Sequence, residues 1–443
     1  MSIIFRNFAD CKKPKHMTRA LTLITTLLLV IAAHASDFSF VGADKTVIRV
    51  VPEASSGLNS VFVAFTVEGL KVTCSPSATG ETVTWYSFGT AGAAYAEKIA
   101  EGRELSNLKG GQGYIAESGN RREYFWLIDY SAAPYSVTGL RASGESDCAV
   151  TELTVDGTAE RLTYTAINGR QIEIDRQISL SYYTLKAEGN HFEQIQVCDL
   201  HPFLRASIHA DAPLCDTRFC LTGDRFLREW GMESVVESEA FTAMAVSAVT
   251  SVVSDSRDVA NEQTGPMDEI GGSAPVSATF SATVTDAAVF TEWQIATDEE
   301  FSNVILRERT LDMPYTFTKA GSFFVKFTAA DAAGICLWES DTYRVDIGES
   351  RLRCPNAFSP GASEGINDIW CVSYRSIVEF DCSIFNRWGV RMTRFTDPSQ
   401  GWDGRYKGRI VDPGVYYYII KARGSDGKIY NLSGDINIVG SRK

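Results

Sequence analysis

The sequence of 443 residues carries a formal net charge of −13, from 42 Lys and Arg against 55 Asp and Glu. Nucleic acids and anionic membrane surfaces attract positive charge, so this acidity argues against either as a partner. At about 100 to 200 residues per domain, the length predicts roughly three or four domains.

The first predicted element is an export signal. An apolar run over residues 21–33 follows four basic residues, Lys12, Lys13, Lys15 and Arg19, and Ala33-His34-Ala35 offers small residues where a signal peptidase cuts. The run is too short to span a bilayer core, which takes about 20 residues. We therefore predict a cleaved signal peptide over 1–35, with Met17 as an alternative start, and no transmembrane segment.

The cysteines fit an exported chain. Removal of Cys11 with the signal leaves nine, an odd number in which at least one thiol is unpaired or pairs between molecules. His191, His201 and His209 lie near several of them in sequence, but the spacings match no zinc pattern. We expect oxidised or buried cysteines, no metal site and no cofactor.

Residues 36–150 have the pattern of a β-sandwich. Strand-like runs at 61–67, 82–88 and 124–130 alternate with turn-forming segments such as the glycine-rich 109–113. Five aromatics in these runs could form a ligand platform or fill a core, namely Trp85, Tyr86, Tyr124, Phe125 and Trp126. We expect the core, because inward-facing aromatics normally fill a sandwich.

Residues 151–253 predict a second β-rich domain with one short helix. Alternating runs occupy 162–166, 172–174 and 178–185. The segment 225–230 is the helix candidate, with Asp224 as its N-cap and Gly231 as its stop.

Residues 254–274 lack apolar periodicity and predict a loop or linker before a third sandwich over 275–350. Strand patterns at 276–280 and 323–327 bracket that region, and Tyr315-Thr316-Phe317 with Ala320-Gly321 resembles the closing strands of a polycystic kidney disease-type (PKD) immunoglobulin-like domain. By analogy with sandwiches generally, Trp293 would be its buried inter-sheet aromatic.

Residues 351–443 carry the most specific motifs of the chain. Their order and spacing resemble the gliding motility-associated C-terminal domain, the type B sorting domain of type IX secretion in Bacteroidetes-like Gram-negative bacteria. The motif residues are Asn356, Phe358, Pro360, Asn367, Asp368, Asn386, Arg387, Trp388, Gly389, Gly401, Trp402, Asp403, Gly404, Gly414 and Tyr416. The resemblance implies a β-sandwich that an outer-membrane translocon reads as an address, with the protein then displayed on the surface or released.

Three local expectations accompany this resemblance. Trp388 and Trp402 should pack in the core and at a corner, and Gly427 should form a tight hairpin because it can take a positive φ. The loop 361–365 has fewer carboxylates than such loops commonly carry, so we expect no obligate metal. Its G-x-S-x-G pattern lacks the strand-to-helix context of a catalytic serine.

The sequence as a whole predicts an all-β fold of tandem immunoglobulin-like β-sandwich domains with a C-terminal β-sandwich sorting domain. We expect no catalytic residues, and a non-enzymatic adhesion, binding or structural role with an envelope or host-surface ligand. One alternative is a surface hydrolase of glycans or proteins with its site within 36–240. Another is a structural component of a surface or motility assembly.

Overall fold

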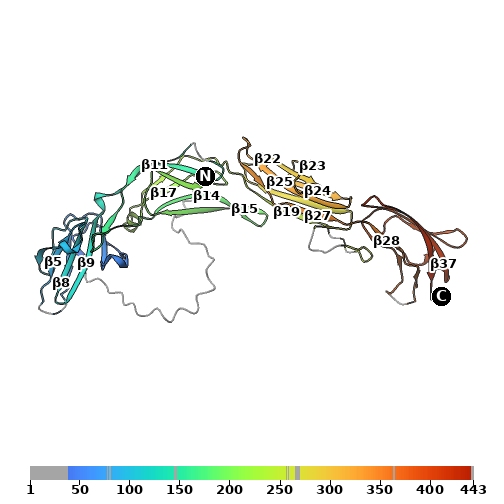
Figure 1. Cartoon of the computed structure of the whole chain (residues 1–443), viewed down its shortest axis with the longest axis horizontal. Coiled ribbons are helices and arrows are strands. Elements are labelled where there is room, and N and C mark those ends of the chain that lie inside the picture. The colour runs from blue at the N-terminus through green and yellow to red at the C-terminus, as the bar shows by residue number, and fades with distance from the viewer. Residues whose placement is uncertain are drawn as a thin grey trace, which may run out of the picture. The chain divides into compact units, whose positions relative to one another are not determined.

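The computed structural model describes residues 38–440, apart from residues 77, 79, 80, 144–146, 256, 258, 265–269, 363 and 364. The predicted signal peptide lies outside the described residues. Nearly all regular structure is β-strand, as Figure 1 shows, and the fold is all-β. The chain divides into two units: one runs to Thr184 and includes Gln194–Thr242, and the other comprises Leu185–Glu193 and Ala243–Lys443.

The first unit begins with a six-stranded sheet in the order β2-β3-β9-β8-β5-β6. Its strands are β2 (Ile48–Val50), β3 (Ser60–Ala64), β9 (Arg121–Asp129), β8 (Gln112–Ser118), β5 (Thr84–Phe88) and β6 (Glu97–Glu101). A smaller sheet of β1 (Phe38–Val41), β4 (Lys71–Cys74) and β7 (Glu104–Leu105) packs on one face. Trp85, Phe125 and Trp126 are buried between the strands, so the core interpretation is confirmed for these three, whereas Tyr86 and Tyr124 are half-buried beneath the Arg122 guanidinium.

The rest of the first unit is a second sandwich. One sheet holds β10 (Tyr135–Ala142), β11 (Val150–Ala159) and β16 (Ser207–Asp211), and the other has the order β15-β14-β17-β18. The latter strands are β15 (His191–His201), β14 (Ile178–Glu188), β17 (Cys220–Thr222) and β18 (Val235–Glu237), and β12 (Thr163–Thr165) pairs with β13 (Gln171–Glu173). A single apolar core runs from Ile48 in the first sheet to Trp230 in the second sandwich, so the two predicted domains share one interior.

The short helix α1 (Arg225–Glu229) closes this shared interior. Asp224 is its N-cap and accepts a hydrogen bond from the Leu227 amide at 3.0 Å, and Gly231 follows the helix at φ +69°. The prediction of this helix and its two ends is confirmed.

The second unit contains an immunoglobulin-like sandwich. Its first sheet is β19 (Ala248–Ser254), β21 (Val276–Val284) and β24 (Asp312–Phe317). Its second has the order β20-β27-β25-β22-β23, with strands β20 (Gly271–Gly272), β27 (Tyr343–Ile347), β25 (Gly321–Ala330), β22 (Phe290–Ala296), β23 (Val304–Glu308) and β26 (Leu337–Glu339) paired to β25. Trp293 is fully buried in this core beside Phe280 and Phe327, as expected.

The described residues of the predicted linker 254–274 are irregular apart from Ser254, which ends β19, and the short strand β20, and some of them pack against the C-terminal domain. Asn261 Nδ2 donates to the carbonyls of Val372 and Pro398, both at 2.8 Å. Glu262 is buried, pairs with Arg257 at 2.8 Å and bridges to Tyr374. A buried carboxylate such as Glu262 is stable only with a partner such as Arg257. The segment is therefore part of the packed contact with the C-terminal domain.

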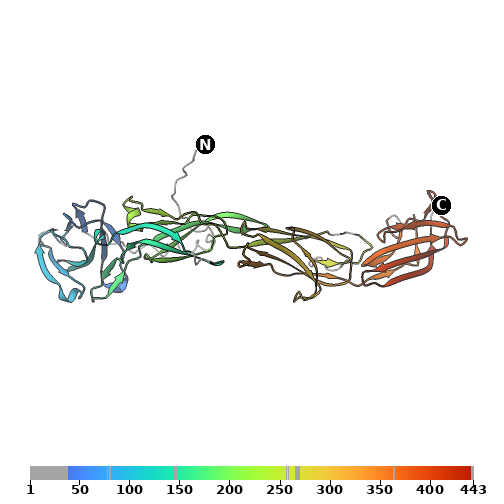
Figure 2. The same ribbon diagram turned by 90° about the horizontal axis from the view of Figure 1, so that it is seen from above.

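The C-terminal domain is a sandwich around one apolar core. Its main sheet has the order β29-β38-β37-β32-β33, with β29 (Ala357–Phe358), β38 (Ile429–Ile438), β37 (Gly414–Gly424), β32 (Ile377–Phe385) and β33 (Arg391–Phe395). Short pairs cover one face: β28 (Arg351–Arg353) with β31 (Ser373–Arg375), β30 (Trp370–Cys371) with β34 (Gly401–Trp402), and β35 (Arg405–Tyr406) with β36 (Arg409–Ile410). Figure 2 shows the long strands, in red, side by side. Gly427 turns the β37–β38 hairpin at φ +80°, as predicted.

Candidate functional site

One group of the C-terminal motif residues builds a buried corner. The ring of Trp402 lies 5.5 Å from that of Phe358 and 5.2 Å from that of Tyr416. A Cβ on Gly404, which has φ +72°, would meet Pro360 Cγ at 2.6 Å, so only glycine fits beneath that proline. Trp402 Nε1 donates to the Arg405 carbonyl at 3.0 Å, which satisfies its polar atom. These positions are therefore structural.

A second group forms the turn between β32 and β33. The Asn386 side-chain oxygen accepts from the amides of Trp388 and Val390, both at 3.0 Å, and Gly389 takes φ +82°. The expectation that Trp388 packs in the core is wrong, because its side chain is 73% exposed. The turn closes on backbone bonds and on the Asn386 side chain, so it does not need the indole, and the Arg387 guanidinium lies 4.3 Å from the centroid of the exposed ring.

A third group organises the loops at the domain's edges. The Asp368 carboxylate accepts from the amides of Gly361 and Gly365, at 2.8 and 2.7 Å. Both of its oxygens thus serve loop closure, in a loop whose residues 363 and 364 lie outside the described residues. Asn367, at φ +56°, accepts from the Ser359 amide at 2.9 Å.

Most of the remaining motif residues make backbone hydrogen bonds or occupy positions that require glycine. The Asn356 carbonyl accepts from the Asn437 amide at 2.9 Å, and Asp403 accepts from the Arg405 amide at 3.0 Å. A Cβ on Gly401 would meet the Trp370 carbonyl oxygen at 2.7 Å, and Gly414 takes φ +153° at the start of β37. The motif residues are thus spread over a corner, a turn and loops.

Sequence reasoning missed the solvent-facing side of the main sheet. Val415, Tyr417 and Ile419 alternate along β37 and are 42, 46 and 49% exposed. Their neighbours Tyr416, Tyr418 and Ile420 face the core instead. Because both faces of β37 are apolar, the sequence pattern shows a strand but not which residues face solvent.

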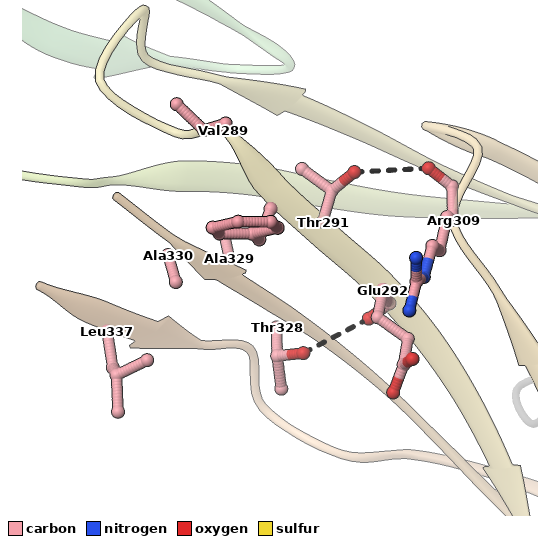
Figure 3. Close-up of a pocket in the computed structure, with 9 residues that line it drawn as sticks. Val289, Thr291, Glu292, Arg309, Thr328, Ala329, Ala330 and Leu337 are labelled. Carbon is pink, nitrogen blue, oxygen red and sulfur yellow. Dashed lines mark hydrogen bonds between the residues drawn. The ribbon is translucent and has the colours of Figure 1, made fainter. Parts of the chain in front are cut away.

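A pocket of about 400 Å³ opens on the immunoglobulin-like domain. Figure 3 shows Val289, Thr291, Glu292, Arg309 and Leu337 among the residues around it. The hydroxyls of Thr291 and Thr328 donate to backbone carbonyls, and Glu292 is paired with Arg307. Among the polar groups that line the pocket, the two threonine hydroxyls and the Glu292 carboxylate have partners, and Glu292 is the single carboxylate there.

Five cysteines carry free thiols in the described part of the chain, namely Cys215, Cys220, Cys354, Cys371 and Cys382. Burial, with the neighbouring Cys354 thiol, raises the pKa of Cys382 to about 12. A thiol held protonated in a core is unreactive, so Cys382 acts as an apolar packing residue. Within the described residues, no group of three or more His, Cys, Asp and Glu side chains could hold a metal ion.

Among the described residues, no helix has the length and apolar character required to cross a bilayer.

Comparisons with known proteins assign two parts of the chain. Residues 352–436 match the model of the CHU_C type IX secretion signal domain, and residues 141–238 match that of a fibronectin type III domain. Among curated proteins, none matches the chain.

Several solved structures overlap it at low similarity. A tetra-tandem repeat from the extending region of a large adhesion protein is 13% identical over 84% of this chain and 96% of that one, with a TM-score of 0.21. The FN1–FN3 domains of chicken CNTN1 are 12% identical over 69% and 99%, with a TM-score of 0.22. Dimeric latent PorU from Porphyromonas gingivalis is 9% identical over 72% and 35%, with a TM-score of 0.16.

The chain therefore carries a fibronectin type III domain, an immunoglobulin-like sandwich and a C-terminal type IX secretion signal domain, which implies export to the cell surface or the outside.

Proposed function

We propose that this protein is a non-enzymatic adhesion, binding or structural protein of the cell envelope, delivered through the outer membrane by the type IX translocon. The observation that carries the proposal is the type IX secretion signal domain at 352–436, placed after tandem β-sandwiches. Sandwich domains of this kind commonly serve as stalks and binding modules, and function resides in the surfaces that they present.

The motif geometry supports an addressing role for the C-terminal domain. Its motif residues build the corner at Trp402 and the turn at Trp388. A domain built in this way offers a defined exterior for recognition. We further propose that the sandwich before it, with Trp293 buried between its sheets, is of the PKD type.

The proposal is tested by protease accessibility in intact cells. The full chain is compared with a chain that ends before Cys354, and both are followed by tags placed in the first unit. We expect the full chain to be digested by external protease and the truncated chain to stay protected in the periplasm. Equal digestion of both would show that the C-terminal domain is not an address.

The non-enzymatic part has its own test. The purified mature protein is assayed against peptide and glycan libraries, with binding measured in parallel. A hydrolytic activity that a single carboxylate or serine substitution abolishes would replace this proposal with the hydrolase alternative.

A further inference from the structure

The outer face of the main C-terminal sheet carries an apolar stripe on β37. We define this stripe as Val415, Tyr417 and Ile419. Side chains two residues apart on a strand share one face, and this spacing spans about 14 Å at roughly 3.4 Å per residue. All three are more than 40% exposed, although the opposite face of the same strand is packed in the core. An exposed apolar row on an otherwise well-packed domain typically marks an interaction site.

The strand register extends the stripe towards the turn with the exposed tryptophan. Tyr417 pairs with Phe385, the last residue of β32, and Phe385 pairs with Arg391 at the start of β33. The intervening turn presents Trp388 and Val390, which are 73 and 45% exposed. Aromatic side chains of this kind are the usual anchors of protein interfaces.

Positive charge borders the stripe. Arg394 is paired with Asp381, but Arg391 and Lys421 form no ion pair with any residue that the structure describes. Lys421 lies two residues beyond Ile419 on the same face, and Arg391 lies in the row of Tyr417. Both act on Asp381, whose pKa is lowered by the Arg394 hydrogen bond and by the charges of Lys421 and Arg391, but these three cations outnumber that one carboxylate.

The net charge of the whole C-terminal domain also favours an acidic partner. Residues 351–443 contain 14 Lys and Arg against nine Asp and Glu, a net charge of +5, so residues 1–350 carry −18 of the total of −13. The signal domain is thus basic in an acidic chain. Such segregation steers an acidic partner to this domain and away from the rest of the chain.

We propose that the stripe, with Arg391, Lys421 and Trp388 around it, docks onto a protein of the export machinery that presents an apolar surface bordered by carboxylates. This docking proposal rests on the proposed export function and identifies the face of the C-terminal domain that the export machinery binds. Asp435 lies opposite Tyr417 on β38, so the border carries both signs in fixed positions. A mixed border suits a protein surface better than a uniformly anionic lipid or polysaccharide layer.

The test uses the full chain in intact cells. The double variant Tyr417→Ser/Ile419→Ser removes two of the three apolar side chains of the stripe, and Arg391→Glu reverses one border charge. A matched control, Ile305→Ser/Leu311→Ser, removes two similarly exposed apolar side chains from the immunoglobulin-like domain. Because truncating interface anchors typically weakens binding at least about tenfold, we expect the stripe variant and Arg391→Glu to lower the surface-exposed fraction about tenfold, with the control unchanged.

The experiment distinguishes failure of the proposed export function from failure of the docking proposal. Normal export of the chain truncated before Cys354 overturns the proposed function itself. Retention of that truncated chain together with normal export of the stripe variant and of Arg391→Glu overturns only the docking face. Circular dichroism of the purified protein shows whether the stripe variant is folded. If it is unfolded, the export of Arg391→Glu tests the docking proposal, because the Arg391 side chain is exposed and lies outside the core.

The purified protein distinguishes other occupants. Light scattering measures its oligomeric state, and flotation measures its binding to phosphatidylglycerol vesicles. A dimer or vesicle binding that Tyr417→Ser/Ile419→Ser abolishes, with export unchanged, assigns the face to a second copy or to lipid and overturns the proposal.

Discussion

Arg176 and Asp224 form an ion pair in the first unit in which both side chains are completely buried, with Nη2 and Oδ2 separated by 2.6 Å. Asp224 also caps α1 and accepts from the Tyr130 hydroxyl at 3.1 Å. Arg176 donates to the carbonyls of Ala133 and Glu160. One ion pair thus ties the helix to two loops of the shared core.

Substitution of Asp224 by Ala should strongly destabilise the first unit. It leaves the Arg176 charge buried without a partner, which costs about 3–5 kcal/mol, and it also removes a helix cap. Denaturant unfolding of the mature chain measures the loss, with hydrogen exchange at residues 225–230 as the local probe.

The matched control for that prediction is Asp156→Asn. Asp156 pairs with Arg141 on the surface of the same unit, where ion pairs contribute at most about 1 kcal/mol. A similar loss of unfolding free energy in the two variants would show that the buried ion pair stabilises the unit no more than the surface pair does.

The stability of the first unit should fall at high pH through Tyr130. Burial and the Asp224 charge raise the pKa of Tyr130 to about 12, against about 10 for an unfolded tyrosine. The folded state therefore favours the neutral phenol, a contribution that is complete below pH 10 and is lost as the pH rises from 10 to 12. Within that window, wild type should lose up to about 1.4 kcal/mol per pH unit through this group.

The variant Tyr130→Phe tests this titration. Its free energy of unfolding should lie below that of wild type by a constant amount up to about pH 9, because it lacks the hydrogen bond to Asp224. Above pH 10 the gap should shrink, since phenylalanine has no proton to lose. Parallel pH profiles of the two proteins up to pH 12 would contradict the assignment.

The two tryptophans of the C-terminal motif should behave oppositely. Trp402 is 2% exposed and its removal should cost about 3–5 kcal/mol, as for other buried aromatics. Trp388→Ala should change the unfolding temperature by no more than an ordinary surface substitution. Thermal unfolding of both variants checks this, and comparable losses would return Trp388 to a packing role.

A glycine in the first sheet should tolerate no side chain. A Cβ on Gly113 would lie 2.1 Å from Phe88 Cζ, and the Phe88 ring is buried against Trp126. We expect Gly113→Ala to cost about 1–3 kcal/mol through overpacking. Gly89→Ala is the control, because a Cβ there meets nothing within 4 Å, and equal losses would exclude the ring contact as the cause.

Removal of divalent cations should leave the C-terminal domain unchanged. The Asp368 carboxylate holds the amides of Gly361 and Gly365, so its oxygens already have donors. Unfolding temperatures in EDTA and in millimolar calcium should agree. A rise in calcium that Asp368→Asn removes would reveal a metal site in this loop.

Sequence reasoning succeeded where the signal is local. The helix at 225–229 has its cap and its stop within eight residues, and the Gly427 hairpin is defined by a positive φ at one position. The burial of Trp293, by contrast, follows from an analogy with β-sandwiches generally. The all-β class follows from repeated strand and turn signals along the chain.

Sequence reasoning failed where the position of a side chain depends on residues far away in the sequence. Arg176 is an isolated arginine in the sequence, and its partner lies 48 residues away. The prediction that Trp388 packs in the core is wrong, because the Asn386 side chain and backbone bonds close its turn and leave the indole 73% exposed. In β37 both faces are apolar, so only the sheet pairing reveals which residues remain uncovered.

The segment 254–274 has a practical consequence for transplanting the export address. Besides Glu262 and Asn261, the hydroxyl of Ser273 accepts from the Ser376 amide at 2.7 Å, and the Ser376 hydroxyl accepts from the Ala274 amide at 3.1 Å. A graft of residues 351–443 onto a foreign cargo would sever these bonds. The portable module therefore begins before β19, whose first residue is Ala248, and includes the whole immunoglobulin-like sandwich, which makes it more than twice the length of the matched signal domain.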